Sequence, residues 1–253
     1  MSEKILVLGA TVAAAAIASV FKENCTVINK GYNCAYEYAD AYKVHKLDLS
    51  RNYLPETENF IADLKIRNLL SDTLLHPLYL AGVMAEYFKK YGSSVYLGST
   101  VEKITESDDG ITAVFYINGE QITQTADILI DTTDFGKYKK VLFAALNAES
   151  DFDEIPLSCI IKGKFASEYY LKTEVTENES FRDAVLRIND IWCKEISEKL
   201  PGMRFASVAN DFATYYEKPV FERTSGRIIH MPSASFADVA QSFEGGLKCC
   251  SLI

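Results

Sequence analysis

The sequence predicts an α/β fold in which a parallel sheet is combined with an antiparallel meander. The chain opens with a strand–helix–strand pattern over residues 5–28, which is typical of a parallel sheet. Short segments that alternate apolar and polar residues then follow one another between positions 94 and 126, as in a set of antiparallel hairpins.

The opening unit is predicted from composition and length. Residues 5–8 (ILVL) are a continuous apolar run, as expected of a strand that is buried on both faces. Residues 11–22 are rich in alanine, which favours a helix, and residues 25–28 (CTVI) predict a second buried strand. Because parallel neighbours need a crossover, the three segments form one strand–helix–strand unit.

The region between the two patterns predicts loop and helix. Residues 31–55 are irregular and rich in tyrosine, and residues 56–71 are expected to be helical. A further helix is expected from His76-Pro77, because proline suits the first helical position, up to a stop at Gly92.

We expect an antiparallel meander next, because Asp108-Asp109-Gly110 and Asn118-Gly119 are turn signals. Its segments are residues 94–97, 100–107, 111–117 and 120–126. An apolar strand over residues 126–134 (ADILIDTTD) follows them.

The second half of the chain begins with an acidic stretch, residues 147–155, which is a plausible domain boundary. The elements expected after it are a strand at 156–165, an amphipathic helix at 180–200, strands within 204–222, a strand and loop at 226–235, and a helix at 236–250. Gly245-Gly246 is expected to weaken that last helix.

Composition excludes several classes of function. The 253 residues suffice for one large domain or for a domain with a small insertion. A net charge of −9 argues against a nucleic-acid partner, because phosphate binding needs clustered Lys and Arg. No charged-then-apolar leader precedes the first strand, and no apolar run reaches the roughly 18 residues of a membrane span. We therefore expect a cytoplasmic protein without a membrane span.

The six cysteines and three histidines do not indicate a metal site. The sequence has no C-x-x-C, and no histidine is paired with a cysteine at zinc-like spacing, so reduced thiols and no metal are expected. The terminal CSLI has the form of a prenylation signal, and ordinary burial of Cys249-Cys250 is the alternative.

Three stretches fall in the order found in a known family. They are the opening strand–turn–helix, the segment 76–104 with ADILIDTTDFG (126–136), and PSASFADVAQSFEGGL (232–247). This pattern resembles the FAD-dependent oxidoreductases of the glutathione-reductase-like superfamily, the flavoproteins with two dinucleotide-binding domains. The resemblance implies a Rossmann-like FAD-binding domain with a parallel sheet and a β-meander over residues 1–145 and 203–253. Residues 146–202 would be a small inserted α+β substrate or cap domain.

The resemblance makes the first turn a degenerate G-x-G-x-x-G/A motif. Its three positions are Gly9, Thr11 and Ala14, with Ala10 in the same loop. The first glycine makes the turn, the second lets the backbone approach a pyrophosphate, and the third must be small. Thr11 departs from the pattern, because its branched side chain would occupy the space of phosphate oxygens. The helix N-terminus still offers N–H groups, and the threonine hydroxyl can donate to a phosphate.

Two further positions depart from the family pattern. An acidic residue normally binds the ribose about 20 residues after the first strand, and Asn29 followed by Lys30 stands there. In DTTDFG the family has glycine at the position of Asp134. A carboxylate close to phosphates is unfavourable unless it is turned away or the ligand is absent.

The resemblance implies further cofactor contacts. They are Val101, whose backbone would meet the adenine, Thr132 and Thr133 after the apolar strand, and Ser235 and Phe236 in the loop that would close the flavin site. For Val101, ordinary strand burial is the alternative.

Other residues have two interpretations. The loop 31–42, with four tyrosines and Cys34, would stack on a flavin or bind a partner, and the alternative is a packed or mobile surface loop. His230 is a catalytic candidate or a structural histidine. Tyr215, Tyr216 and Glu217 line a substrate cavity or pack in the interior.

Three functions remain open. The first is an FAD-dependent oxidoreductase, or a flavoprotein subunit, that acts on a small-molecule substrate and forms a homo- or hetero-oligomer. Its catalytic residues are not identifiable from the sequence. The second is a flavin-free scaffold or partner subunit, which Thr11, Asn29 and Asp134 favour and which predicts an obstructed cleft. The third is reuse of the cleft for another ligand without redox chemistry, which predicts a cleft that is open but too short for FAD.

Overall fold

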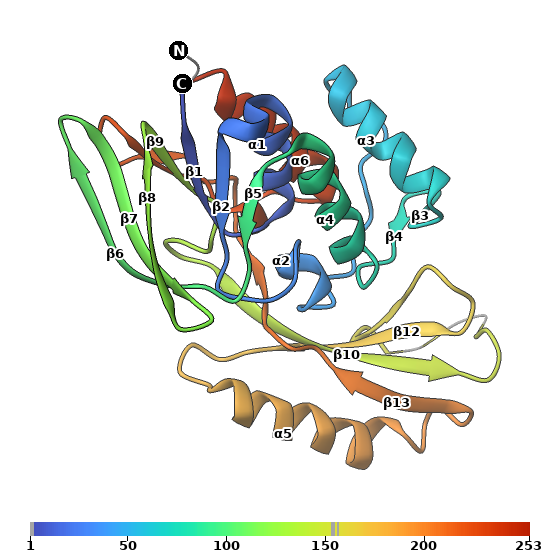
Figure 1. Cartoon of the computed structure of the whole chain (residues 1–253). Coiled ribbons are helices and arrows are strands. Elements are labelled where there is room, and N and C mark those ends of the chain that lie inside the picture. The colour runs from blue at the N-terminus through green and yellow to red at the C-terminus, as the bar shows by residue number, and fades with distance from the viewer. Residues whose placement is uncertain (1–2, 153–154, 156) are drawn as a thin grey trace.

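The computed structural model describes residues 3–152, 155 and 157–253, and its centre is a six-stranded sheet (Figure 1). The strand order is β15–β16–β9–β1–β2–β5, and all neighbours are parallel except β15 and β16. The strands are β1 (Ile5–Leu8), β2 (Cys25–Ile28), β5 (Ser94–Tyr96), β9 (Ile128–Asp131), β15 (Glu222–Arg223) and β16 (Ile228–His230). The α/β class with a parallel sheet is confirmed.

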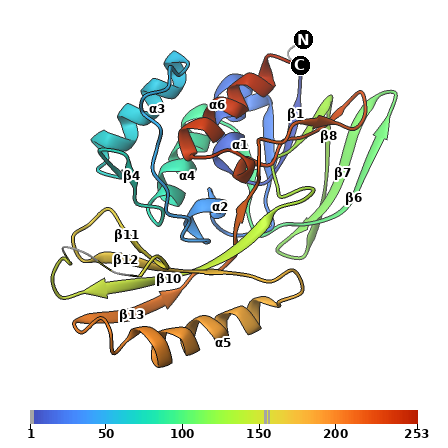
Figure 2. The same ribbon diagram turned by 180° about the vertical axis from the view of Figure 1, so that it is seen from behind.

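The sheet is buried on both faces. Helices cover one face and a three-stranded meander lies against the other (Figures 1 and 2). The helices are α1 (Val12–Phe21), α3 (Pro55–Ile66), α4 (Leu80–Tyr91) and α6 (Val239–Cys250), and the meander strands are β6 (Thr100–Ser107), β7 (Gly110–Ile117) and β8 (Glu120–Ala126). Val7 packs in the helical core, whereas its neighbour Leu6 packs with Phe115 of the meander. The continuous apolar run of β1 follows from this burial on both sides.

The meander has three strands rather than four. Residues 94–96 pair in parallel with β2, in a register that sets Ser94 opposite Thr26. The preceding helix α4 returns the chain to the same end of the sheet, which is the crossover that a parallel pair requires. The expectation that the segment 94–97 belongs to the antiparallel set was therefore wrong, because residues 94–96 extend the parallel sheet.

Helices α1 and α6 approach each other closely at Gly246. A Cβ atom there would lie 2.4 Å from the Ala13 carbonyl oxygen and 2.8 Å from Ala16 Cβ. Gly245-Gly246 does not interrupt α6, which runs from Val239 to Cys250. The missing side chain of Gly246 lets the backbones of α1 and α6 pack in direct contact over the parallel sheet.

A second, five-stranded antiparallel sheet lies beside the first unit, with β10 (Lys139–Ala148) at its centre. β10 pairs with β12 (Glu168–Glu174) on one side and with β13 (Met203–Val208) and β14 (Ala213–Tyr215) on the other, and β11 (Ile160–Lys162) extends it beyond β12. The helix α5 (Phe181–Ile191), continued by the π-helical turn η2 (Trp192–Ile196), packs on one face of this sheet. The sheet extends beyond residues 146–202 at both ends, and the division into domains stays a prediction.

The remaining elements are short. They are α2 (Tyr36–Ala39), the hairpin β3 (Leu70–Ser71) and β4 (Leu74–Leu75), and the 3₁₀ turns η1 (Lys22–Asn24) and η3 (Ser233–Ser235). Figure 1 shows α2 between the parallel sheet and the antiparallel sheet. In the part of the chain that the structure describes, no helix combines the length and the apolar character needed to cross a membrane.

Candidate functional site

The turn between β1 and α1 requires glycine at its first position. Gly9 has a φ of +91°, and a Cβ atom there would lie 2.9 Å from the Thr132 hydroxyl. Its backbone N–H donates to the Ile28 carbonyl at 2.9 Å, which joins the turn to the end of β2. The turn is thus built as a Gly-rich phosphate-binding turn would be at this first position.

Thr11 is fully buried and is bonded only within the protein. As the N-cap of α1 it accepts the Ala14 N–H at 3.1 Å, and its hydroxyl donates to Thr132 Oγ1 at 2.8 Å. Thr132 in turn donates to the Leu8 carbonyl oxygen at 2.7 Å. Since each hydroxyl has a single proton, neither threonine has one left for a phosphate.

Side chains of the chain itself occupy the other N–H groups at the start of α1. The Ala10 N–H donates to Asn29 Oδ1 at 3.1 Å, and the Val12 N–H donates to Glu37 Oε1 at 2.9 Å. The Ala13 N–H donates to Ser233 Oγ at 3.3 Å. These donors belong to the turn and first turn of the helix, where a fold of this kind binds anions.

Glu37 is the only one of these partners that brings a carboxyl group. It lies in α2, is almost fully buried, and also accepts the Ser233 hydroxyl at 2.7 Å. Burial raises the pKa of this carboxyl to about 7, although the Val12 N–H and Ser233 act in the opposite direction. Its second oxygen, Oε2, has no hydrogen-bond partner among the described residues.

The segment that carries Glu37 is anchored in the core. The Ala35 N–H donates to the Ala10 carbonyl oxygen at 2.6 Å, and Tyr38 is fully buried. Four residues after the end of α2, the ammonium group of buried Lys43 donates to the Thr214 carbonyl at 2.8 Å and to the Ala234 carbonyl at 3.2 Å. The tyrosine-rich loop is thus a packed structural segment over most of its length.

A pocket of about 780 Å³ remains open beside this segment. Five of the residues singled out in the sequence line it together, namely Gly9, Asn29, Lys30, Val101 and Thr133. Other lining residues that matter for its chemistry are Tyr32, Tyr36, Asp40 and Asp211. Burial raises the pKa of Asp211, and the neighbouring Asp40 acts in the same direction. The structure thus keeps a cleft at the ends of β1 and β2.

Asn29 forms the base of that pocket. Besides the bond from Ala10, its amide nitrogen donates to the Gly31 carbonyl at 2.9 Å and to the Asn33 carbonyl at 3.2 Å. Both amide protons are therefore used to shape the loop after β2. Thr133 is also bonded locally, because its hydroxyl and its N–H donate to Asp131 Oδ1 at 2.6 and 3.0 Å.

The other sequence candidates do not share the open pocket. Ala10, Thr11, Ala14 and Thr132 are buried beneath it. Ser235 and Phe236 line a separate pocket of about 140 Å³, together with Tyr215, Tyr216 and Glu217. Ser235 donates to the Pro232 carbonyl at 2.7 Å.

Asp134 is turned toward the antiparallel sheet. Its Oδ1 accepts the Thr214 hydroxyl at 3.0 Å and the Tyr216 hydroxyl at 3.1 Å. The surrounding protein raises its pKa by desolvation, which these two hydrogen bonds partly offset. From the sequence, an acidic residue at position 134 was expected to be tolerated if its carboxylate is turned away from the phosphates or if the ligand is absent. The structure shows the first of these two arrangements.

Cys34 and His230 do not form a reactive centre. Burial raises the pKa of the Cys34 thiol to about 11, and Glu37 acts in the same direction, so this cysteine lacks the lowered pKa that redox chemistry needs. His230 Nδ1 lies 3.3 Å from Asp131 Oδ2, and its ring stacks on Phe135 with centroids 4.5 Å apart. No group of three or more His, Cys, Asp or Glu in the described ranges is placed to hold a metal ion.

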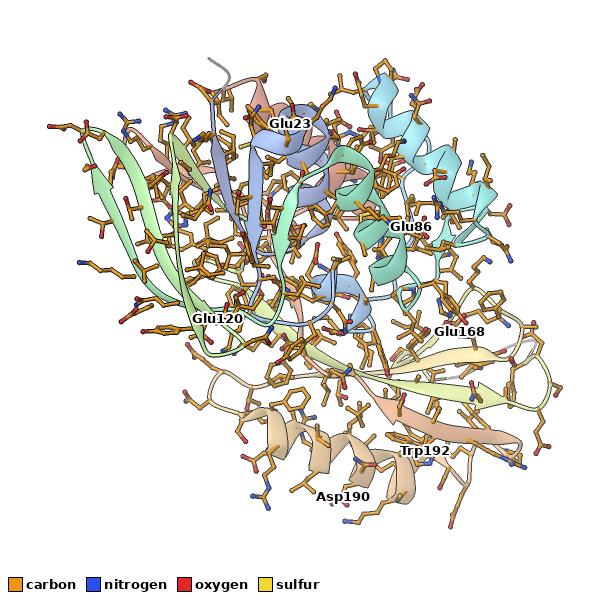
Figure 3. All side chains as sticks on the ribbon, in the orientation of Figure 1. Glu23, Glu86, Glu120, Glu168, Asp190 and Trp192 are labelled. Carbon is orange, nitrogen blue, oxygen red and sulfur yellow. The ribbon has the colours of Figure 1, made fainter. Side chains whose placement is uncertain are left out.

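A second polar cluster joins the two units away from the cleft. His76 Nε2 lies 3.2 Å from Glu168 Oε1, and Glu168 also accepts the hydroxyl of Tyr170. Figure 3 labels Glu168 on the side of β12 that faces the helices, whereas the labelled Trp192 and Asp190 lie by α5 on the other side of that sheet. The cluster connects the antiparallel sheet to the parallel-sheet unit.

The cleft fits FAD at one end only. A dinucleotide on this fold sets its pyrophosphate on the first N–H groups of α1, and its ribose and adenine toward the second strand. The open pocket beside Asn29, Lys30 and Val101 can take the second part. The first N–H groups are bonded to Asn29, Glu37, Ser233 and Thr11, so the donors that phosphate oxygens would need already have partners. In this arrangement the residues present do not fit the pyrophosphate.

Sequence reasoning did not find Glu37 or Ser233. Glu37 lies within the loop 31–42 that the sequence singled out, yet it bonds to a residue 25 positions earlier. Ser233 bonds to Ala13, which is 220 positions away. Neither partner can be read from local spacing. The one available signal was an acidic residue inside an aromatic segment.

Comparison with known proteins finds structural similarity without close sequence relatives. No protein-family model and no curated protein matches the sequence. The p-nitrophenol 4-monooxygenase PnpA from Pseudomonas putida DLL-E4 is 13% identical, with a TM-score of 0.62 over 97% of this chain and 76% of that one. Glycine oxidase from Geobacillus kaustophilus is 10% identical, with a TM-score of 0.64 over 99% of this chain and 94% of that one.

A flavin-dependent halogenase is similar as well. The halogenase PltM was solved in complex with FAD in a mutant form, and that structure is 13% identical, with a TM-score of 0.60 over 99% of this chain and 69% of that one. These neighbours share one α/β architecture, and the PltM structure shows that this architecture can hold FAD. The chain has the fold of the FAD-binding flavoproteins.

Proposed function

We propose that this chain is a flavin-free relative of the FAD-binding flavoproteins, which keeps their fold and a shortened ligand cleft. One observation carries the proposal: the Glu37 carboxyl is hydrogen-bonded to the Val12 N–H, at the position where a dinucleotide pyrophosphate would bind. A helix N-terminus attracts hydrogen-bond acceptors and negative charge, and here the chain supplies a carboxyl group of its own at that position.

Displacing this internal group would be costly. An FAD pyrophosphate would have to take the hydrogen bonds of Glu37 and move the segment that also carries buried Ala35 and Tyr38. Exposing one large apolar side chain costs about 1.5–3 kcal/mol, and each lost internal hydrogen bond about 1 kcal/mol more. The segment is therefore better described as part of the fold than as a lid.

The open part of the cleft supports binding of a smaller molecule. Its walls combine the rings of Tyr32 and Tyr36 with the polar groups of Lys30, Asp40 and Asp211. Apolar walls with a few polar groups are typical of small-molecule sites. This corresponds to a cleft that is open but too short for FAD, with no redox chemistry assigned to it.

An FAD-dependent oxidoreductase is the second candidate, because the structural neighbours are flavoproteins and one of them was solved in complex with FAD. It also uses the pocket beside Asn29, Lys30 and Val101. To bind FAD in this way, the chain would have to move residues 31–42, which include Glu37, away from the N-terminus of α1. The specific link to the glutathione-reductase-like superfamily, a cytoplasmic location and an oligomeric state stay predictions.

The first experiment is the visible spectrum of protein purified without added cofactor, with mass spectrometry of the small molecules released on denaturation. We expect a colourless protein that releases no FAD and does not bind added FAD. Flavin bands with stoichiometric FAD would contradict the proposal and establish the second candidate.

Glu37→Ala tests the cause, with Glu58→Ala on the exposed face of α3 as the matched control. If Glu37 closes the pyrophosphate position, only Glu37→Ala gains affinity for FAD in a fluorescence titration. Equal behaviour of the two variants would show that other features close the cleft.

A further inference from the structure

A second hollow, of about 830 Å³, opens at the edge where β10 begins and β12 ends. Four lysines line it, namely Lys137, Lys139, Lys140 and Lys172. They come from the segment after β9, the start of β10, and β12. Tyr138 and Tyr215 supply aromatic walls. We refer to this hollow as the lysine cleft.

Sheet register brings two of these lysines onto the same face. Lys139 stands opposite Tyr215 of β14, and Lys172 stands opposite Phe143 of β10. Because side chains alternate along a strand, residues 139 and 143 point to the same face, and Lys172 shares it. Lys139 and Lys172 therefore converge from neighbouring strands on the face that carries Tyr215.

The positive charge of the lysine cleft is not neutralised by pairing. No carboxylate of the described residues lies within 4.0 Å of any of the four ammonium groups. Glu174 and Glu177 also line the cleft, which leaves an excess of two positive charges among its lining residues. The whole chain carries a net charge of −9, so this local excess has the opposite sign to the protein.

Tyr215 adds a recognition surface beside that charge. The ammonium group of Lys172 lies 5.4 Å from the centroid of its ring, and that of buried Lys43 lies 4.6 Å from it. Lys140 is similarly placed 6.0 Å from the ring of Tyr138. Contact with a ring face uses no specific N–H donor, so the ammonium groups of Lys140 and Lys172 can still donate to another acceptor, whereas Lys43 already donates to the Thr214 and Ala234 carbonyls.

We propose that the lysine cleft binds a small phosphate or carboxylate anion with at least two negative charges, beside the rings of Tyr215 and Tyr138. Carboxylates and phosphates share the oxygen acceptors that lysine ammonium groups bind. The cleft is separate from the pocket at Asn29, so the proposal holds whether or not the chain binds FAD.

The test is calorimetric titration of the full chain with inorganic pyrophosphate and with citrate, at low ionic strength. The variant is Lys139→Gln/Lys172→Gln. The control is Lys65→Gln/Lys103→Gln, which removes the same charge from two exposed lysines elsewhere. We expect a Kd near or below about 1 mM for at least one anion, about tenfold weaker binding by the cleft variant, and binding within about twofold of wild type by the control.

The two probes separate the sources of the anion. Binding of pyrophosphate alone assigns the cleft to phosphates, and binding of citrate alone assigns it to carboxylates. No binding of either anion at about 10 mM, or equal weakening by the control, would overturn the proposal. If the double variant does not fold, Lys139→Gln alone gives the answer, because this side chain is exposed.

Discussion

The Glu37 carboxyl accepts the backbone N–H of Val12 at 2.9 Å, in the first turn of α1. The first N–H groups of a helix have no partner within the helix, and acidic side chains are preferred there. Such a capping side chain normally belongs to a residue at the helix start or next to it in sequence. Here it comes from α2, after the chain has passed through β2, and it occupies the position on which dinucleotide binding depends.

Replacement of Glu37 by glutamine should change how stability depends on pH. In the folded protein the pKa of Glu37 is raised to about 7, against an ordinary value of 4.5. Between these values the folded state holds a proton that the unfolded state has lost, so stability falls as pH rises from about 4.5 to about 7. Glu37→Gln removes this loss, which amounts to about 3 kcal/mol.

The measurement is urea unfolding of wild type and Glu37→Gln at a series of pH values. The difference between the two proteins isolates Glu37, because His45, whose pKa burial lowers to about 4, is common to both. We expect the free energy of unfolding of Glu37→Gln, relative to that of the wild type, to increase as pH rises from 5 to 7.5. Parallel stability curves would contradict the assignment of a shifted carboxyl.

Thr11→Ala should destabilise the protein without opening a phosphate site. The substitution removes the cap on the Ala14 N–H and the hydrogen bond to Thr132. Loss of an N-cap costs about 1–2 kcal/mol. Urea unfolding measures this loss in the free energy of unfolding. The control is Thr224→Ala in an exposed loop, which should stay within about 0.5 kcal/mol of wild type. Thr11→Ala with wild-type stability would show that the cap is not needed.

Two helical glycines should respond to alanine in opposite directions. At Gly246 a Cβ atom would lie 2.4 Å from the Ala13 carbonyl oxygen, so Gly246→Ala should destabilise the protein by about 1–3 kcal/mol. Nothing lies within 4 Å of a Cβ at Gly82 in α4, so Gly82→Ala should stabilise it by about 0.5–1 kcal/mol. Thermal unfolding of both variants gives the comparison. Stabilisation by Gly246→Ala would mean that α1 and α6 are further apart.

The cysteines should react with alkylating reagents at very different rates. Cys193 is exposed, whereas Cys34 is buried and its pKa is raised to about 11. Only the thiolate reacts, so at pH 7.5 we expect labelling of Cys193 to be on the order of 100-fold faster than that of Cys34. Peptide mass spectrometry after timed iodoacetamide treatment measures this. Rapid labelling of Cys34 would contradict the burial of the loop 31–42, and Cys193→Ser should remove the fast phase.

Local pattern predicted the elements whose burial has a regular period. The strands 5–8 and 25–28 are apolar because both faces of the sheet are covered, and the turn signals after residues 107 and 117 place the hairpins of the meander. β10 and β12 were not anticipated. β10 begins with two lysines, and β12 contains charged residues at both ends, so neither shows a simple apolar alternation.

The sequence by itself determined the α/β class, the crossover around α1 and the degenerate turn at Gly9, Thr11 and Ala14. Each of these depends on residues that are close along the chain. Only the tertiary structure decided that Glu37 and Ser233 cap α1, that Asp134 turns toward Thr214, and that Lys139 and Lys172 lie on the face that carries Tyr215. Those contacts join segments that sequence spacing leaves unrelated, because packing of the two sheets and not local propensity sets their distances.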